Sequence, residues 1–164
     1  MKVLVSDTSV LIDLERAAVV VAAMALPFEF VVPDALYEQE LRGWNGETLL
    51  TLGLRIEALG DNEVSHASVA RRVCPKLSII DAFALALAEL RQWTLLAGDA
   101  ALRAEAQSRG LACHGTLWVF DQLESAQVLN AAALHDALSA LGAHPRCRLP
   151  AGEIRLRLSR YKKA

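Results

Sequence analysis

Residues 2–9 read Lys-Val-Leu-Val-Ser-Asp-Thr-Ser. The run Lys2–Ser6 has the short apolar character of a strand that is buried on both faces of a parallel sheet. Asp7 ends this run, and the two hydroxyl residues after it can cap a helix that we expect over Val10–Met24. Ligands of open α/β sheets bind outside the carboxyl ends of the strands. This stretch therefore predicts a strand, an acid at the ligand-binding edge of a sheet, and a helix.

The same pattern recurs in the next segment. Phe28–Val32 is a second apolar run, and Pro33 opens a helix that carries Glu38 and Glu40 and stops before Gly43. An acid thus follows the second strand as well.

Two further acids stand in the middle of the chain. Ser78–Arg91 is the clearest helix, and its broad apolar face predicts that it lies against the sheet. It carries Asp81, while Asp99 follows the expected strand Thr94–Ala97. Other expected elements are a short edge strand (Leu54–Leu59), a helix from Asp61 or Asn62 to about Val73, a helix (Ala100–Arg109) and a final strand (Leu111–His114).

Strands that alternate with helices indicate parallel crossover units with helices on both faces of the sheet. The predicted fold class is therefore α/β, a three-layer α/β/α sandwich with a mainly parallel central sheet. A chain of 164 residues supports one core, so we expect a single domain over residues 1–164. Residues 126–164 form its C-terminal helical extension, with helices over Ala131–Leu141 and Glu153–Tyr161.

Composition excludes several classes of protein. The formal net charge of −2 lacks the basic field of proteins that hold nucleic acid by charge alone. Three cysteines without a Cys-x-x-Cys pair argue against a disulfide framework and a closed zinc site. The N-terminus has neither a signal peptide nor a membrane span, so we expect a cytoplasmic protein with no membrane partner.

Each of the four acids has an ordinary structural alternative. Asp7 and Asp99 can be helix N-caps, Asp81 completes a capping-box-like Ser-x-x-Asp with Ser78, and Glu38 can be a solvated helix residue. Their joint placement is the stronger signal, because the predicted sheet brings all four to one end. Clustered carboxylates repel one another unless a cation neutralises them. An all-oxygen set suits Mg²⁺ or Mn²⁺, ions that support phosphoryl chemistry.

Four motifs in this order resemble the PIN-domain ribonucleases, especially the VapC-like toxins of toxin–antitoxin pairs. They are Val-Leu-Val-Ser-Asp-Thr-Ser (residues 3–9), Val-Pro-x-x-x-x-Glu (32–38), Leu-Ser-Ile-Ile-Asp-Ala (77–82) and Leu-Leu-Ala-Gly-Asp (95–99). The resemblance covers roughly residues 1–125. It implies a PIN-like fold, a homodimer, a cognate antitoxin, and Mg²⁺- or Mn²⁺-dependent cleavage of an RNA substrate.

By motif match, the resemblance implies that Asp7, Glu38, Asp81 and Asp99 are the catalytic and metal-binding acids. Glu40 lies close to Glu38 in the sequence, and the spacing leaves both open, with Glu38 preferred. Ala97 departs from the family, in which a threonine is common before Gly-Asp.

Two other hypotheses stay open. The first is a catalytically inactive PIN-like module that binds RNA or protein, which Ala97 and the slightly acidic charge favour. The second, a phosphate-transfer receiver or aspartyl phosphatase, is weaker, because those folds need two aspartates close together after the first strand. The segment Gly152–Lys163 also predicts a helix with an apolar stripe and a basic face that could contact phosphates.

Overall fold

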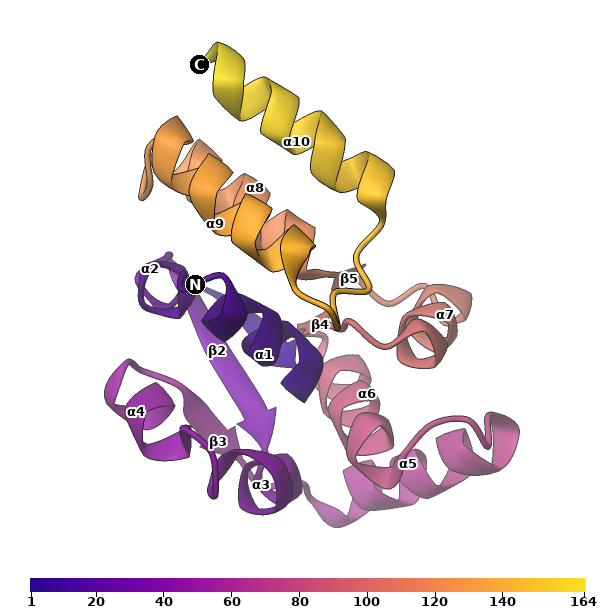
Figure 1. The fold of residues 1–164 in the computed structure, drawn as a ribbon. Coiled ribbons are helices and arrows are strands. Elements are labelled where there is room, and N and C mark those ends of the chain that lie inside the picture. Colours follow the sequence, from indigo (N-terminus) through magenta and orange to yellow (C-terminus); the bar gives the residue numbers. More distant parts are fainter.

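A single parallel sheet of five strands forms the centre of the computed structural model, which describes residues 1–164 (Figure 1). The strands are β1 (Lys2–Ser6), β2 (Phe28–Pro33), β3 (Arg55–Glu57), β4 (Thr94–Leu96) and β5 (Cys113–His114). Their order is β3-β2-β1-β4-β5, so the chain builds outward from β1 in one direction and then in the other. The boundary between β1 and β4 is the switch point of a doubly wound sheet. The predicted fold class is confirmed.

Helices connect the strands. They are α1 (Thr8–Arg16), α2 (Val20–Met24), α3 (Asp34–Leu36), the π-helical turn η1 (Tyr37–Leu41), α4 (Gly46–Thr51), α5 (Asp61–Val73), α6 (Ile79–Arg91), α7 (Ala100–Ser108), α8 (Thr116–Ser125), α9 (Ala131–Ala143) and α10 (Ala151–Lys163). None of them is long and apolar enough to cross a membrane.

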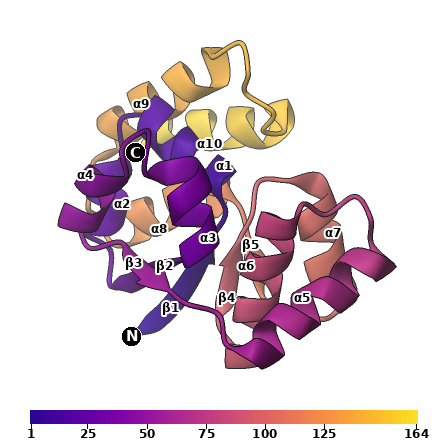
Figure 2. The ribbon, with the colours of Figure 1, turned by 90° about the horizontal axis from the view of Figure 1, so that it is seen from below.

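The sheet divides the core into two clusters. Leu4 and Leu96 pack with α1, α8 and α9 on one face, whereas their neighbours Val5 and Leu95 pack with α6 and α7 on the other. Figure 2 shows these two helical layers on either side of the strands. The period of two along each strand thus sends alternate side chains into different layers.

The helix expected over Val10–Met24 is two helices in the structure. Ala18 lies in the left-handed region, with φ at 56°, and separates α1 from α2. The amide of Val19 donates to the carbonyl of Leu14, which closes the turn. The change in direction buries Val19 and Val20 in the same cluster as α1. The short helix α4 was not predicted.

A π-helical turn interrupts the helix after β2. The amide of Arg42 donates to the carbonyl of Tyr37 over 2.8 Å, five residues back instead of four. The wider turn leaves Tyr37 and Leu41 both buried. It also changes the direction in which Glu38 and Glu40 point compared with a regular helix.

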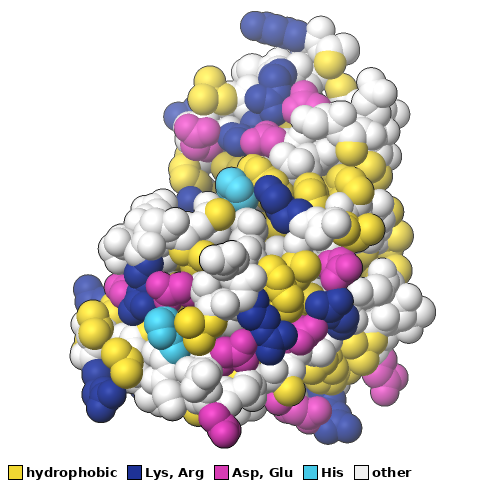
Figure 3. All heavy atoms as spheres, turned by 180° about the vertical axis from the view of Figure 1, so that it is seen from behind, with side chains coloured by type: hydrophobic (Ala, Val, Ile, Leu, Met, Phe, Trp, Pro, Cys, Tyr) yellow, Lys and Arg dark blue, Asp and Glu magenta, His cyan; other side chains and the backbone are white.

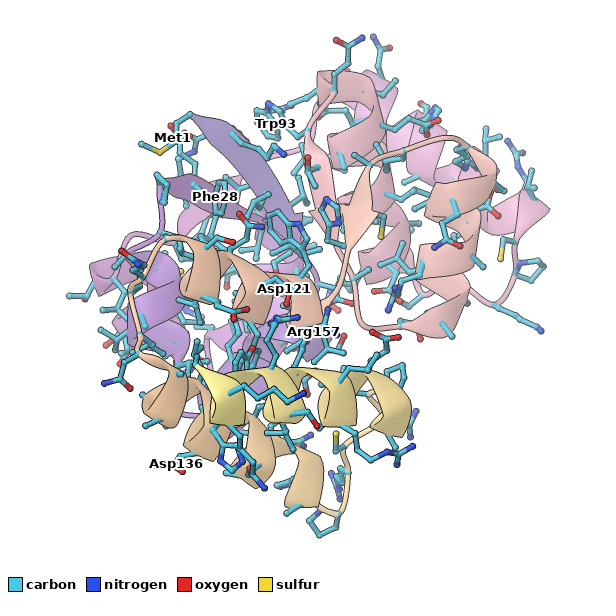
Figure 4. The ribbon with its side chains drawn as sticks, turned by 90° about the horizontal axis from the view of Figure 1, so that it is seen from above. Met1, Phe28, Trp93, Asp121, Asp136 and Arg157 are labelled. Atoms are coloured by element: carbon cyan, nitrogen blue, oxygen red, sulfur yellow. The ribbon has the colours of Figure 1, made fainter.

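The C-terminal helix α10 docks on α8 and α9. Its stripe residues Ile154 and Tyr161 are buried, as expected. Figure 4 shows Arg157 of α10 facing Asp121 of α8. The Nε and Nη2 atoms of Arg157 donate hydrogen bonds of 2.8 and 2.7 Å to the two oxygens of the Asp121 carboxylate. Arg160 is likewise paired, to Asp121 and Glu124. The basic face expected on this helix comprises five cations, of which two, Arg157 and Arg160, are paired inside the molecule. The full set is Arg155, Arg157, Arg160, Lys162 and Lys163.

Candidate metal centre at the switch point of the sheet

Asp7 joins the ends of the two central strands. Its carboxylate is 2% exposed and accepts hydrogen bonds from the amide of Val10 (2.9 Å), the hydroxyl of Ser9 (2.8 Å) and the amide of Gly98 (2.8 Å), with a longer one from the amide of Asp99 (3.4 Å). Asp7 is thus the N-cap of α1 and also the link between β1 and β4. Burial raises the pKa of Asp7 in spite of these donors.

Gly98 allows this link because it has no side chain. A Cβ atom built at this position would lie 2.4 Å from the hydroxyl of Ser9, which is closer than any side chain tolerates. Gly98 thus allows the close approach of Ser9, whose hydroxyl also donates to Asp7. A side chain at position 98 would therefore require Ser9, one of the donors to Asp7, to move.

Asp81 and Asp99 reach the same place from two helix N-termini. Asp81 lies in the first turn of α6, where its amide donates to the hydroxyl of Ser78 (3.0 Å). Asp99 caps α7 by accepting from the amide of Leu102 (2.9 Å). The structural roles that the sequence offered for these acids are thus real, and they fix each carboxylate at the carboxyl edge of the sheet.

The neighbouring acids affect the pKa of Asp81. Burial, together with the negative charges of Asp7, Asp99 and Glu40, raises the pKa of Asp81 to about 6. Each of these three must therefore lie near Asp81. The structure brings together three of the four predicted acids, and the fourth neighbour is Glu40.

Glu40, and not Glu38, points to this cluster. The hydroxyl of Thr8 donates to the carboxylate of Glu40. Glu38 instead accepts from Arg42 over 2.5 Å, one turn along its own helix, with 53% of its side chain exposed. The preference for Glu38 does not fit this geometry, because the π-helical turn shifts the phase that a regular helix would give. Thr8, which the sequence indicated only as a helix-capping residue, is thus the hydrogen-bond partner of Glu40.

The acid cluster, defined here as Asp7, Glu40, Asp81 and Asp99, has no ion-pair partner among the basic side chains. Two carboxylates at about 4 Å repel by roughly 1 kcal/mol in water and more where water is partly excluded. Hard oxygen donors with uncompensated charge fit Mg²⁺ or Mn²⁺. No three histidine, cysteine, aspartate or glutamate side chains are arranged in this structure so that they could hold a metal ion together. The arrangement suits an ion that keeps several of its own waters, as Mg²⁺ does.

Ala97 lies beneath the cluster and not in it. Its side chain is fully buried and packs in the core cluster that contains Leu95 and Leu102. Its backbone amide donates to the carbonyl of His114 over 2.9 Å and continues the β4–β5 pairing. The departure at this position therefore removes a hydroxyl and leaves the four carboxylates in place.

Fold and site together define a class of protein, a doubly wound α/β domain with an acidic switch point. A family model described as PIN domain matches residues 3–163, and the chain belongs to the PIN-domain family. PIN domains are typically nucleases. The search of curated proteins gave no match.

Among solved structures, the chain is similar to a PilT N-terminus domain protein from the archaeon Sulfolobus solfataricus P2. The two share 15% sequence identity over 76% of this chain and 92% of the other, with a TM-score of 0.47. The family assignment rests on the family model, and the role of the acids as metal ligands stays a prediction.

Proposed function

We propose that this PIN domain is a metal-dependent endoribonuclease that hydrolyses RNA phosphodiester bonds with Mg²⁺ or Mn²⁺. One observation carries the proposal: four carboxylates from β1, η1, α6 and the end of β4 gather at the switch point without a basic partner. Helix capping accounts for Asp7 and Asp99 singly, but the mutual repulsion of four clustered carboxylates opposes folding of the metal-free protein. A divalent cation removes that penalty.

The proposal assigns Asp7, Glu40, Asp81 and Asp99 to the ion and its waters, with Glu40 replacing Glu38. A bound divalent ion lowers the pKa of water and polarises a phosphate. The chain contributes rigidity. Asp7 is fixed by four donors and Glu40 by the hydroxyl of Thr8, so neither carboxylate has to reorganise on binding.

Calorimetry with Mn²⁺ tests this function, together with cleavage of a single-stranded RNA in the presence and absence of chelator. We expect the unmodified protein and Asp136→Asn to bind Mn²⁺ and to cleave, since the side chain of Asp136 is 88% exposed and lies on α9. Asp81→Asn should lose about 100-fold or more in activity, the upper end of what support to a metal site is worth.

The alternative function, a PIN-like module that binds RNA or protein without turnover, makes the opposite prediction. Its decayed site would take up no Mn²⁺ in the unmodified protein, and chelator would leave its binding unchanged. Heat of Mn²⁺ binding that is equal in the unmodified protein and in Asp81→Asn would also contradict the proposed site.

We further propose that the enzyme is a homodimeric toxin held inactive by a cognate antitoxin. This finer assignment is supported by the ordered motifs that resemble VapC-like toxins, and it goes beyond the family assignment. Growth arrest on expression, relieved by Asp81→Asn and by co-expression of a protein from a neighbouring reading frame, would support it. Unimpaired growth with a catalytically active protein would contradict the toxin role and leave the nuclease function intact.

A further inference from the structure

A hollow of about 820 Å³ opens directly beside the acid cluster. Ser9, Gly98 and Asp99 form its end at the switch point, and α1 and α7 form two of its walls. The connection between α9 and α10, residues 144–150, provides the third wall. Figure 1 shows this connection running from the helical layer down towards β4 and α7. A segment outside the sheet is thereby placed next to the proposed site of cleavage.

Four arginines line this hollow, which we call the arginine groove: Arg16 from α1, Arg103 from α7, and Arg146 and Arg148 from the connection. Asp13 and Asp99 are the acids in its lining, so the four positive charges exceed the two negative ones. Asp13 is also partly satisfied, because the hydroxyl of Thr116 donates to it over 2.7 Å. Burial raises the pKa of Asp13, whereas the hydrogen bond from Thr116 and the nearby charge of Arg16 lower it.

These arginines differ from most others in the chain because they have no carboxylate partner. Six arginines elsewhere are tied up in ion pairs: Arg42, Arg55, Arg91, Arg109, Arg157 and Arg160. None of the four groove arginines forms an ion pair or a side-chain hydrogen bond. Free guanidinium groups present a planar set of donors that matches phosphate oxygens.

The overall charge of the protein does not attract a polyanion such as RNA. The net charge is −2, and Figure 3 shows acidic and basic side chains interspersed on one face of the molecule without a single basic patch. A polyanion therefore needs a local site. The groove offers one whose end is the acid cluster itself.

We propose that the arginine groove holds the phosphate backbone of single-stranded RNA beside the acid cluster, with Arg146 and Arg148 as positioning residues. The inference rests on the proposed nuclease function and adds a substrate path to it. The volume falls within the range of about 300–1,000 Å³ typical of ligand sites. A positively charged groove that follows the backbone is also how proteins hold single strands. Five of the 17 lining residues are hydrophobic, so the groove lacks the apolar anchors by which peptides usually dock.

RNA binding without cleavage tests the groove. The probe is a fluorescein-labelled single-stranded RNA of mixed sequence and about 12 nucleotides, within the usual site size for such strands. Its anisotropy is followed in EDTA with Asp81→Asn as the parent protein, at several salt concentrations. We compare the parent with Arg146→Ala/Arg148→Ala, with Arg146→Lys/Arg148→Lys, and with Arg155→Ala. Arg155 is an exposed, unpaired arginine on α10 outside the groove and serves as the matched control.

We expect the double alanine variant to bind about 10-fold more weakly and to reduce the slope of log K against log salt by about 1.4. Each phosphate contact to a single strand contributes about 0.7 to that slope. The double lysine variant should keep the slope, and Arg155→Ala should behave like the parent. A structural effect of the substitutions would not follow charge in this way.

The proposal is overturned if the parent does not bind the RNA, if the double alanine variant keeps both affinity and slope, or if Arg155→Ala loses as much. A double variant that keeps RNA but loses a protein partner would assign the groove to that partner and also overturn it. Mn²⁺ calorimetry on Arg146→Ala/Arg148→Ala with Asp81 intact separates the two levels. If the double alanine variant binds both Mn²⁺ and RNA normally, the proposed role of the groove is wrong but the nuclease function is unaffected. If the unmodified protein does not bind Mn²⁺, the proposed nuclease function itself is wrong.

Discussion

Two groups of acidic side chains in this molecule differ in whether arginines neutralise them. Between α8 and α10, Asp121 and Glu124 are bound by Arg157 and Arg160 at distances of 2.5 to 3.1 Å, and these contacts raise the pKa of both arginines. At the switch point the four carboxylates of the acid cluster have backbone and hydroxyl donors but no basic side chain. The first cluster is complete as it stands and holds a helix in place. The second lacks a positive charge, which is the property expected of a cation site.

The largest effect on this contrast is expected from Asp7→Asn. An amide cannot accept all four of the hydrogen bonds that the Asp7 carboxylate receives, and its own N–H group would face another donor. We expect the free energy of unfolding to fall by about 2 kcal/mol, as measured by urea denaturation. Asp99→Asn is the matched control, because asparagine is a good N-cap and should cost only a few tenths of a kcal/mol. Equal stability of the two variants would contradict the linking role of Asp7.

The next effect separates Glu40 from Glu38. Glu40→Gln should weaken Mn²⁺ binding about 10-fold, because it removes a carboxylate next to Asp81. Glu38→Gln should leave the affinity unchanged, since Glu38 pairs with Arg42 on an exposed surface. Calorimetry measures both. The reverse result would restore Glu38 as the preferred metal ligand.

Arg157→Met breaks the neutralised cluster. Its guanidinium makes a paired contact with Asp121 and another with Glu153, and 15% of its side chain is exposed. We expect the free energy of unfolding to fall by about 1 kcal/mol, and Mn²⁺ binding to be unchanged. A double-mutant cycle with Asp121→Asn isolates the pair. A loss of Mn²⁺ affinity would show that the two acidic regions are coupled.

The smallest expected effect is an increase in stability, caused by Asp81→Asn in the absence of metal. The folded-state pKa of Asp81 is about 6 against an ordinary value of 3.8, so the folded protein holds this proton more tightly than the unfolded chain. The free energy of unfolding therefore falls as the pH rises between these two values and stays low above them. In EDTA, Asp81→Asn should stabilise the protein by somewhat less than 1 kcal/mol at pH 8, after allowance for solvent screening, and the gain should vanish below about pH 4.

Excess Mg²⁺ provides the control for that prediction. A cation that binds only the folded protein stabilises the parent and should cancel or reverse the advantage of Asp81→Asn. Thermal unfolding at pH 8 with and without Mg²⁺ measures this. If Asp81→Asn destabilises the protein in EDTA, the Asp81 carboxylate stabilises the fold without a cation, and this prediction is wrong.

The strands were predictable from sequence because buried parallel strands carry an uninterrupted apolar signal. The range Lys2–Ser6 was predicted without error, and β2 and β4 within one residue. Capping residues fixed the start of α6 at Ser78 and that of α7 at Asp99, both of which make the expected bond. Local chemistry and tertiary packing agree at these points.

The features that the sequence did not predict have one cause. A local sequence pattern shows neither the direction in which a helical side chain points nor its partner in a distant segment. The residues that form a π-helical turn look like any helix in sequence, so Glu38 and Glu40 could not be separated. Ala18 adopts a positive φ without being glycine, so the end of α1 gave no signal. The partners of Arg157 and Arg160 on α8, Asp121 and Glu124, lie more than thirty residues away. The basic face expected on α10 was therefore too large.

The hydrogen bond from the amide of Gly98 to Asp7 joins residues that are 91 positions apart. Closing so long a loop carries an entropic cost that must be met before any contact in the acid cluster can form. If the proposed metal binding holds, the binding of Mn²⁺ during refolding reports the pairing of β1 with β4, whereas circular dichroism reports helices that need only their own segments. A stopped-flow comparison of the two signals would time the formation of the acid cluster separately from that of the rest of the fold.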